Sequence, residues 1–139
     1  MDTVCKNFTS EDCVVIIGGT NDIQKPTRQN CLDQVSTKVT KLSKETNVII
    51  AAVPWRLDTP HLNLEIDKVN TYLYGKVKEN ICQHGNSDNV CYSTSMVDLE
   101  RKYYSRSGLH LNSRGKKIIS HRFAKQIKAI SNNEREKNF

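Results

Sequence analysis

The chain has 139 residues, of which 37% are apolar and 26% are charged, and this is the size and composition of one ordinary globular domain. Its longest apolar run, residues 48–53, is far shorter than a membrane span, and the first 12 residues lack the apolar core of a secretory signal. These features exclude a membrane-spanning protein and predict a cytoplasmic one.

Charge is distributed unevenly along the chain. Residues 1–100 carry 10 Lys and Arg against 13 Asp and Glu, whereas residues 101–139 carry 11 against 2, so the net charge of +6 arises from the C-terminal part. Such an excess indicates either a contact with nucleic acid or an acidic membrane, or simply a solvated helix face. The five cysteines form no Cys-x-x-Cys pair, so we expect free thiols, no metal and no cofactor.

The first elements are a strand, a helix and a second strand. The β-branched run at residues 13–17 predicts a strand buried on both faces of a parallel sheet. Residues 47–53 predict a second buried strand, ended by Pro54. Between them, apolar residues at helical spacing predict an amphipathic helix: Leu32, Val35, Val39 and Leu42.

The second half repeats this alternation. A helical stripe precedes a short strand at residues 90–94, and Ser113 is placed to cap a last helix, which is followed by a charged flexible tail at residues 132–139. The stripes are Ile66, Val69, Leu73, Val77 and Ile81, then Ile119, Phe123, Ile127 and Ile130. We therefore predict one α/β domain over residues 1–131, with a parallel sheet and right-handed crossovers that gather functional residues at the carboxyl ends of the strands.

Two short blocks contain candidate functional residues next to the predicted strands and helices. After the first strand, Gly18 and Gly19 permit a tight turn from which the Asn21 amide can bind an oxyanion, although such a turn can also bind phosphate. Before the last helix, the block Gly-Leu-His-Leu-Asn at residues 108–112 contains His110, either a general base or a structural histidine.

Together with Val-Pro-Trp-Arg-Leu-Asp at residues 53–58, these blocks resemble the SGNH (GDSL-type) hydrolases over roughly residues 12–130. The resemblance implies a three-layer α/β/α, flavodoxin-like fold and the hydrolysis of a small ester by a serine esterase. It also implies that Gly19 and Asn21 form the oxyanion turn and that His110 is the catalytic base.

The chain departs from the family pattern at two points. Ser107 stands where the family has the aspartate that orients the histidine, so a Ser-His dyad is expected in place of a triad. No Gly-Asp-Ser nucleophile block precedes Asn21, and neither Ser10 nor Ser87 has the strand-to-turn setting of a nucleophile. The domain is therefore expected to be N-terminally truncated and inactive alone.

The missing block has a structural consequence. The family places a strand beside residues 14–17, so we expect this run to be an exposed edge that binds a partner chain or a second copy. Asp22, Arg56 and Asp58 are further cleft candidates, although Arg56 and Asp58 can equally form an ion pair. The alternative functions are a non-catalytic binding module, including one for nucleic acid, and a nucleotide binder.

Overall fold

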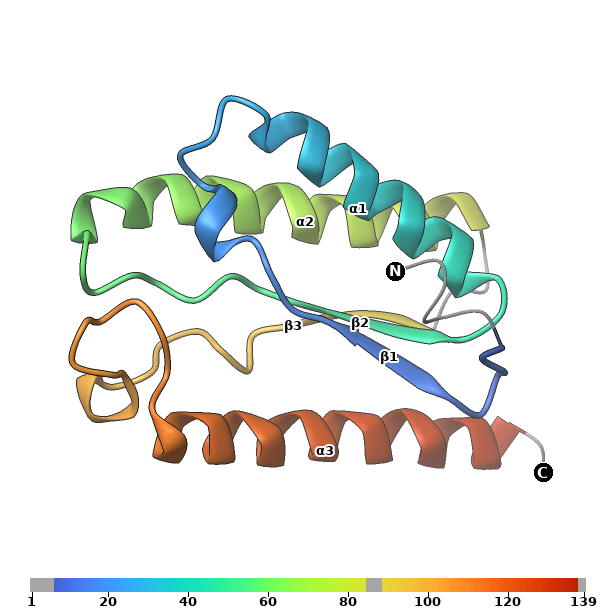
Figure 1. Cartoon of the computed structure of the whole chain (residues 1–139). Helices are drawn as coiled ribbons and strands as arrows, with labels where there is room; N and C mark the ends of the chain where they lie inside the picture. Colours follow the sequence, from blue (N-terminus) through green and yellow to red (C-terminus); the bar gives the residue numbers. More distant parts are fainter. Residues whose placement is uncertain (1–6, 85–88, 138–139) are drawn as a thin grey trace.

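The computed structural model describes residues 7–84 and 89–137, and its strands and helices alternate as the apolar periodicity predicts (Figure 1). The side chains of Asn21, of residues 80–84 and of residues 131–137 lie outside this description. The elements in chain order are β1 (Cys13–Ile16), η1 (Thr20–Asp22), α1 (Arg28–Ser43), β2 (Asn47–Ala51), η2 (Pro60–Leu62), α2 (Asn63–His84), β3 (Val90–Ser93), η3 (Arg101–Tyr103) and α3 (Ser113–Lys137).

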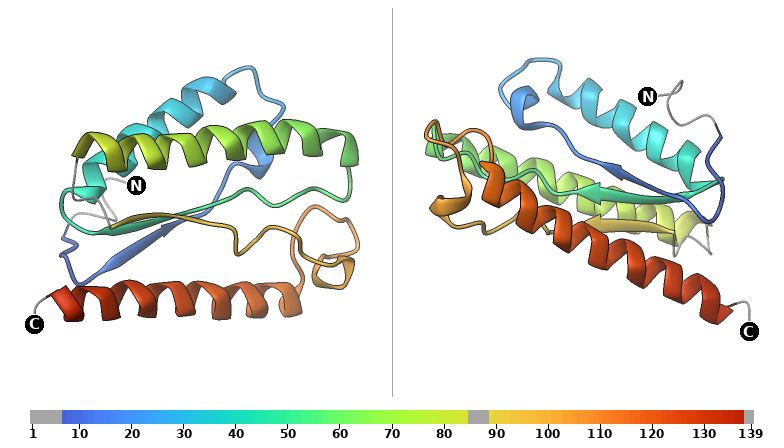
Figure 2. Two further views of the ribbon diagram at one scale, coloured as in Figure 1. Left: turned by 180° about the vertical axis from the view of Figure 1, so that it is seen from behind. Right: turned by 60° about the horizontal axis from the view of Figure 1, so that its bottom comes forward.

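The three strands form one parallel sheet in the order β1-β2-β3. Its register places Val14 beside Val48 and Ile49 beside Cys91. Helices α1 and α2 cover one face of the sheet and α3 covers the other (Figures 1 and 2). Both connecting helices lie on one face because successive crossovers of the same hand advance in the same direction across the sheet. The predicted α/β class and parallel sheet are confirmed.

The central strand β2 is buried along its whole length and separates two apolar clusters. Val48 and Ile50 pack toward α1 and α2, where the predicted stripe of α2 is buried: Ile66, Val69, Leu73 and Val77. Ile49 and Ala51 pack toward α3 on the opposite face, against Ile119 and Phe123. This alternation explains why the strand is continuously apolar, since both of its faces meet helices.

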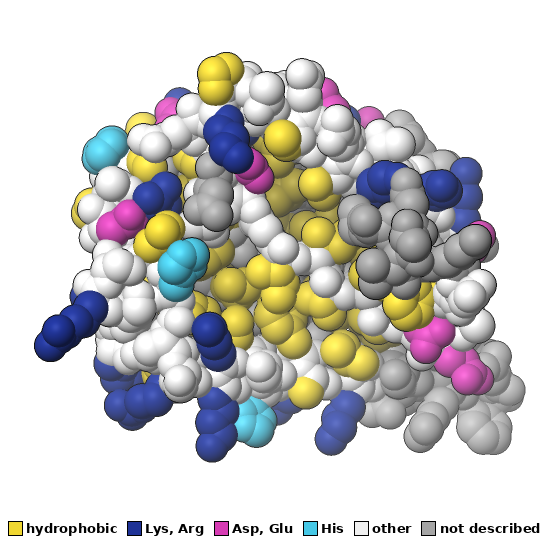
Figure 3. All heavy atoms as spheres, in the orientation of Figure 1, with side chains coloured by type: hydrophobic (Ala, Val, Ile, Leu, Met, Phe, Trp, Pro, Cys, Tyr) yellow, Lys and Arg dark blue, Asp and Glu magenta, His cyan; other side chains and the backbone are white. Residues whose placement is uncertain are grey.

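Strand β1 lies at one edge of the sheet, and all four of its residues are only partly buried. The predicted burial on both faces is therefore only partial for this strand, whereas the expectation of an edge is confirmed. The next residue, Ile17, keeps 53% of its surface exposed. Apolar side chains gather on this face of the molecule, around β1 and between α1 and α3 (Figure 3). Cys13–Ile16 contains no inward charge, no proline and no bulge, and of the usual protections of an edge strand it has only its short length of four residues.

Helix α3 begins one residue after its cap. The Asn112 side-chain oxygen accepts a hydrogen bond from the Gly115 backbone N–H at 2.9 Å, so Asn112 is the N-cap and the predicted cap Ser113 is the first helical residue. The helix continues to Lys137, beyond the expected start of the tail at residue 132. Within the described part of the chain, no helix has both the length and the apolar character needed to cross a membrane.

Candidate functional site

The turn after β1 depends on a glycine. Gly19 has a φ of 96°, in the left-handed region, and a Cβ there would lie 3.1 Å from Val53 Cγ2 at the end of β2. The chain then enters η1, where the Asp22 N–H donates to the Gly19 carbonyl at 3.1 Å. Asp22 forms an exposed ion pair with Lys25 at 3.1 Å, so its carboxylate has a local partner. Asn21 lies in η1, but its side chain is outside the described part of the structure.

The segment after β2 is held by an amide that the sequence patterns do not predict. Asn70, on α2, accepts the Val53 N–H at 2.8 Å and donates to the Val53 carbonyl at 2.9 Å. Two residues further on, the Trp55 carbonyl accepts the Tyr104 hydroxyl at 2.8 Å. These contacts connect three separate parts of the chain at the carboxyl end of the sheet. These contacts join residues 17 and 49 positions apart, so only information on pairs of distant positions would have predicted them.

Arg56 and Asp58 bind each other, the alternative that the sequence left open. Two parallel hydrogen bonds join the guanidinium to the carboxylate, Nε to Oδ1 at 3.0 Å and Nη2 to Oδ2 at 2.7 Å. Their side chains are only 14% and 24% exposed. Hydrogen bonds from Arg56 lower the pKa of Asp58 from 3.8 to about 2, so the carboxylate is ionised at neutral pH. The pair stiffens this segment, and neither charge is left without a partner.

The loop that contains His110 packs directly on this segment. The Leu57 N–H donates to the Gly108 carbonyl at 2.8 Å, and Gly108 has a φ of 76°. A Cβ at Gly108 would lie 2.9 Å from the Asp58 backbone nitrogen, so only glycine fits without movement of the backbone. Within the loop, the His110 carbonyl accepts the Ser105 N–H at 2.8 Å. The backbone on both sides of the histidine is therefore fixed.

The His110 side chain is exposed and, among the described side chains, has no hydrogen-bond or ion-pair partner. Ser107 does not orient it, because the Ser107 hydroxyl bonds the Ser105 hydroxyl at 2.9 Å and accepts the Leu109 N–H at 3.3 Å. The imidazole is thus available to an incoming group, and its ring lacks the carboxylate that a triad would supply.

Asn112, at the end of the histidine block, and Gly115, three residues later, have structural roles. The Asn112 amide donates to the carbonyls of Lys102 and Tyr104, at 2.7 and 3.0 Å, in addition to capping α3. Gly115 presses the first turn of α3 against η3 so closely that a Cβ there would overlap the Tyr103 carbonyl oxygen. Both contacts fix the loop relative to the helix.

The structure thus joins the predicted blocks through the segment at 53–58. The glycine turn packs against its first residue, Val53, and the histidine loop packs against Leu57 and Asp58. No cluster of three potential metal ligands occurs among the described residues. Cys13, Cys31 and Cys91 form no disulfide within the described residues, whereas Cys5 and the side chain of Cys82 lie outside the description. Comparisons with protein-family models, with curated proteins and with solved structures find no match.

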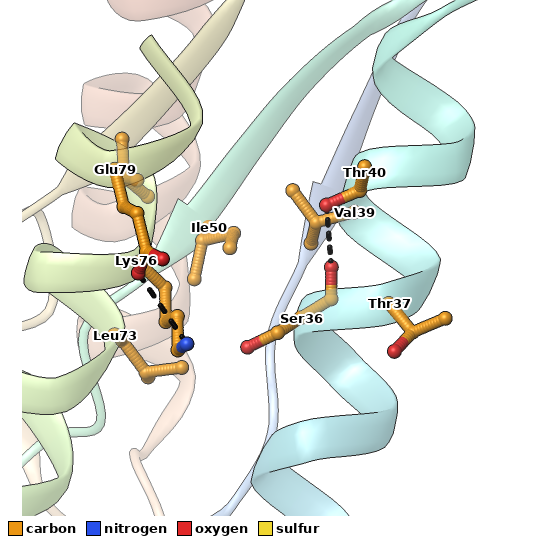
Figure 4. Close-up of a pocket in the computed structure, with 9 residues that line it drawn as sticks. Ser36, Thr37, Val39, Thr40, Ile50, Leu73, Lys76 and Glu79 are labelled. Carbon is orange, nitrogen blue, oxygen red and sulfur yellow. Dashed lines mark hydrogen bonds and ion pairs between the residues drawn. The ribbon is translucent and has the colours of Figure 1, made fainter. Parts of the chain in front are cut away.

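A separate pocket of about 190 Å³ lies between α1 and α2 (Figure 4). Its polar groups are engaged within the fold. The hydroxyls of Ser36 and Thr40 bond backbone carbonyls of their own helix at 3.0 Å, and Lys76 pairs with Glu79 at 3.4 Å. The pocket does not include the carboxyl ends of the strands, where the predicted site residues lie.

Proposed function

We propose that this chain is part of an SGNH-type serine esterase, in which His110 is the catalytic base and Asn21 donates to the oxyanion. The serine is supplied by a polypeptide segment that pairs with the free edge of β1, and the substrate is a small ester. This function belongs to the three-layer, flavodoxin-like fold of that family.

The observation that carries the proposal is the His110 loop. Gly108, Asn112 and Gly115 each make a specific close contact that fixes the loop, while the imidazole at its tip has no partner among the described side chains. The fold does not use the ring nitrogens of this exposed histidine, so they are able to accept a proton from an incoming group. A rigid loop that presents a free imidazole at the carboxyl end of a parallel sheet is the arrangement expected for a base.

The free edge of β1 supports delivery of the serine by another segment. β1 is parallel to β2, and its carboxyl end leads into the Gly18-Gly19 turn. A parallel strand added at this edge would end beside that turn, so a residue at its carboxyl end would reach the same end of the sheet as Asn21 and His110. Such a strand would also cover the partly exposed apolar residues of β1.

The chemistry follows from these positions. His110 accepts the proton of the serine hydroxyl as the serine oxygen attacks the ester carbonyl carbon, and the Asn21 amide donates a hydrogen bond to the resulting oxyanion. The tetrahedral intermediate breaks its bond to the alcohol oxygen, which takes the proton from His110 and leaves. Water then repeats the sequence on the acyl-serine and releases the acid. The Arg56–Asp58 pair holds the segment that positions His110.

The test is a chimera. The N-terminal unit of a characterised SGNH esterase, ending after its nucleophile and glycine blocks, is joined ahead of Asp12, and the product is treated with a fluorophosphonate probe and an aryl ester. We expect one adduct on the donor serine. His110→Ala should abolish labelling, and Asn21→Ala should reduce turnover by about 10²- to 10³-fold. The controls His61→Ala and His121→Ala remove other exposed histidines and should leave labelling unchanged.

Two results would overturn the proposal. One is a chimera that melts cooperatively, as a folded protein does, but neither labels nor hydrolyses the ester. The other is His110-dependent labelling of the present chain alone, since that would place the nucleophile among its own serines.

A further inference from the structure

The outer face of α3 carries a row of basic side chains. They lie three or four residues apart and fall within an arc of about 80° of the helix circumference, because each residue advances about 100°. All five are exposed: Arg114, Lys117, His121, Lys125 and Lys128. Dark blue side chains follow α3 along the lower rim of the molecule in Figure 3, and none of the described helices and strands covers this side of the helix (Figure 2). We call these five residues the α3 basic row.

Over residues 113–130, where the side chains of α3 are described, no acidic residue accompanies the α3 basic row. The sequence Ser113–Ile130 contains no Asp or Glu, and no residue of the row forms an ion pair among the described side chains. Helix α2 differs, because Lys68 pairs with Glu65 and Lys76 pairs with Glu79. Solvated helix faces commonly have such pairs, whereas like charges at this spacing destabilise a helix. Repulsion among the charges of the α3 basic row therefore lowers the stability of α3, and a bound polyanion would offset this repulsion.

We propose that the α3 basic row binds the sugar-phosphate backbone of a nucleic acid. The row extends over about 21 Å of helix, and over this length of duplex axis one strand carries about six phosphates, at roughly 3.4 Å of axis each. A linear array of cations fits a linear array of anions, and a chain with net charge +6 attracts such a ligand at long range.

The composition of α3 favours nucleic acid over an acidic membrane. A helix that lies in a membrane interface inserts an apolar face rich in large residues. The apolar face of α3 is occupied, since Ile119 and Phe123 are buried against the sheet. Beside the α3 basic row, the exposed apolar residues are Ala124 and Ala129, both small. The one large neighbour, Ile118, is partly buried and packs against the cluster under the sheet. Arg122, about 60° around the helix from Lys125, is not part of the row because it donates to the Ser95 carbonyl at 2.8 Å.

The proposal is tested by the anisotropy of fluorescein-labelled oligonucleotides of about 20 nucleotides, single-stranded and duplex, between roughly 50 and 200 mM salt. If the four Lys and Arg of the row each neutralise a phosphate, log K should fall against log salt with a slope of about −3.6 for duplex and about −2.8 for single strands. The affinity for duplex should then decrease about 10²-fold over this range.

A matched pair of variants locates the binding face. Lys117→Gln, Lys125→Gln and Lys128→Gln together should reduce the duplex slope to about −0.9. The control, Lys41→Gln with Lys44→Gln and Lys68→Gln, removes three exposed lysines elsewhere and should keep the full slope.

The proposal is overturned if both triple variants weaken binding equally, or if the oligonucleotides do not bind. It is also overturned if vesicles of anionic phospholipid, or poly-glutamate at the same charge concentration, bind as tightly as the oligonucleotides. None of these outcomes depends on esterase activity, so the α3 basic row and the esterase site succeed or fail separately.

Discussion

Replacing Gly115 with alanine should destabilise the protein, although the same change at most helix positions is favourable. Alanine is more favourable than glycine in a helix by about 1 kcal/mol. At Gly115, however, the new Cβ would overlap the Tyr103 carbonyl oxygen and lie 3.1 Å from Leu111 Cβ. A backbone carbonyl cannot rotate away as a flexible side chain can, so η3 and the start of α3 must separate.

The size of the effect follows from three contributions. Forcing an extra methyl group into packed structure costs about 1–3 kcal/mol. Displacement of the helix start also weakens the Asn112 cap, which is worth about 1 kcal/mol. Subtracting the gain of about 1 kcal/mol in helix propensity leaves a net loss of roughly 1–3 kcal/mol. At this chain length, such a loss lowers Tm by about 3–10 °C.

The matched control is Gly75→Ala, in the middle of α2, where a Cβ meets no heavy atom within 4 Å. This change should stabilise the protein by about 1 kcal/mol. Urea unfolding followed by circular dichroism measures both variants, and the fluorescence of Trp55 reports whether the segment beside the His110 loop has moved. The reasoning is refuted if Gly115→Ala is as stable as the unaltered chain, or if the two substitutions shift stability in the same direction.

Three further predictions concern other contacts of the fold. Asn70→Ala leaves both Val53 backbone groups without partners, so urea unfolding should show a loss of about 2–4 kcal/mol, and a loss below about 0.5 kcal/mol would contradict this role. The pKa of Asp58 is lowered to about 2, so its pairing with Arg56 stabilises the fold above pH 3.8, and this contribution disappears as the pH falls toward 2. By carbon NMR the Asp58 carboxyl should titrate near pH 2, and nearer 3.8 in Arg56→Gln; an unchanged midpoint in that variant would contradict the assigned cause. Sedimentation velocity should show self-association that increases with concentration, and Ile17→Lys, next to the exposed edge of β1, should reduce it. A chain that stays monomeric at every concentration would contradict self-association through β1.

Local patterns in the sequence determined the elements. The β-branched run at 47–53 predicts a strand, and β2 occupies Asn47–Ala51, with Ala52 and Val53 also buried. The stripe that begins at Ile66 predicts the buried face of α2 through Val77. These predictions succeed because burial of one face of a helix, or both faces of a strand, imposes a period on neighbouring residues. The glycine turn and the histidine block are also visible as short local motifs.

The tertiary structure decided which of these elements and residues meet. Cys13–Ile17 has the same composition as a central strand, and only its place at the end of the order β1-β2-β3 leaves it partly exposed. From the sequence alone, Arg56 and Asp58 could either contact a substrate or pair with each other. The conformation of the chain after β2 brings the two side chains together as an ion pair. The two hydrogen bonds between the Asn70 side chain and the Val53 backbone join residues 17 positions apart. Such contacts depend on how distant parts of the chain pack, and periodicity within one element contains no information about them.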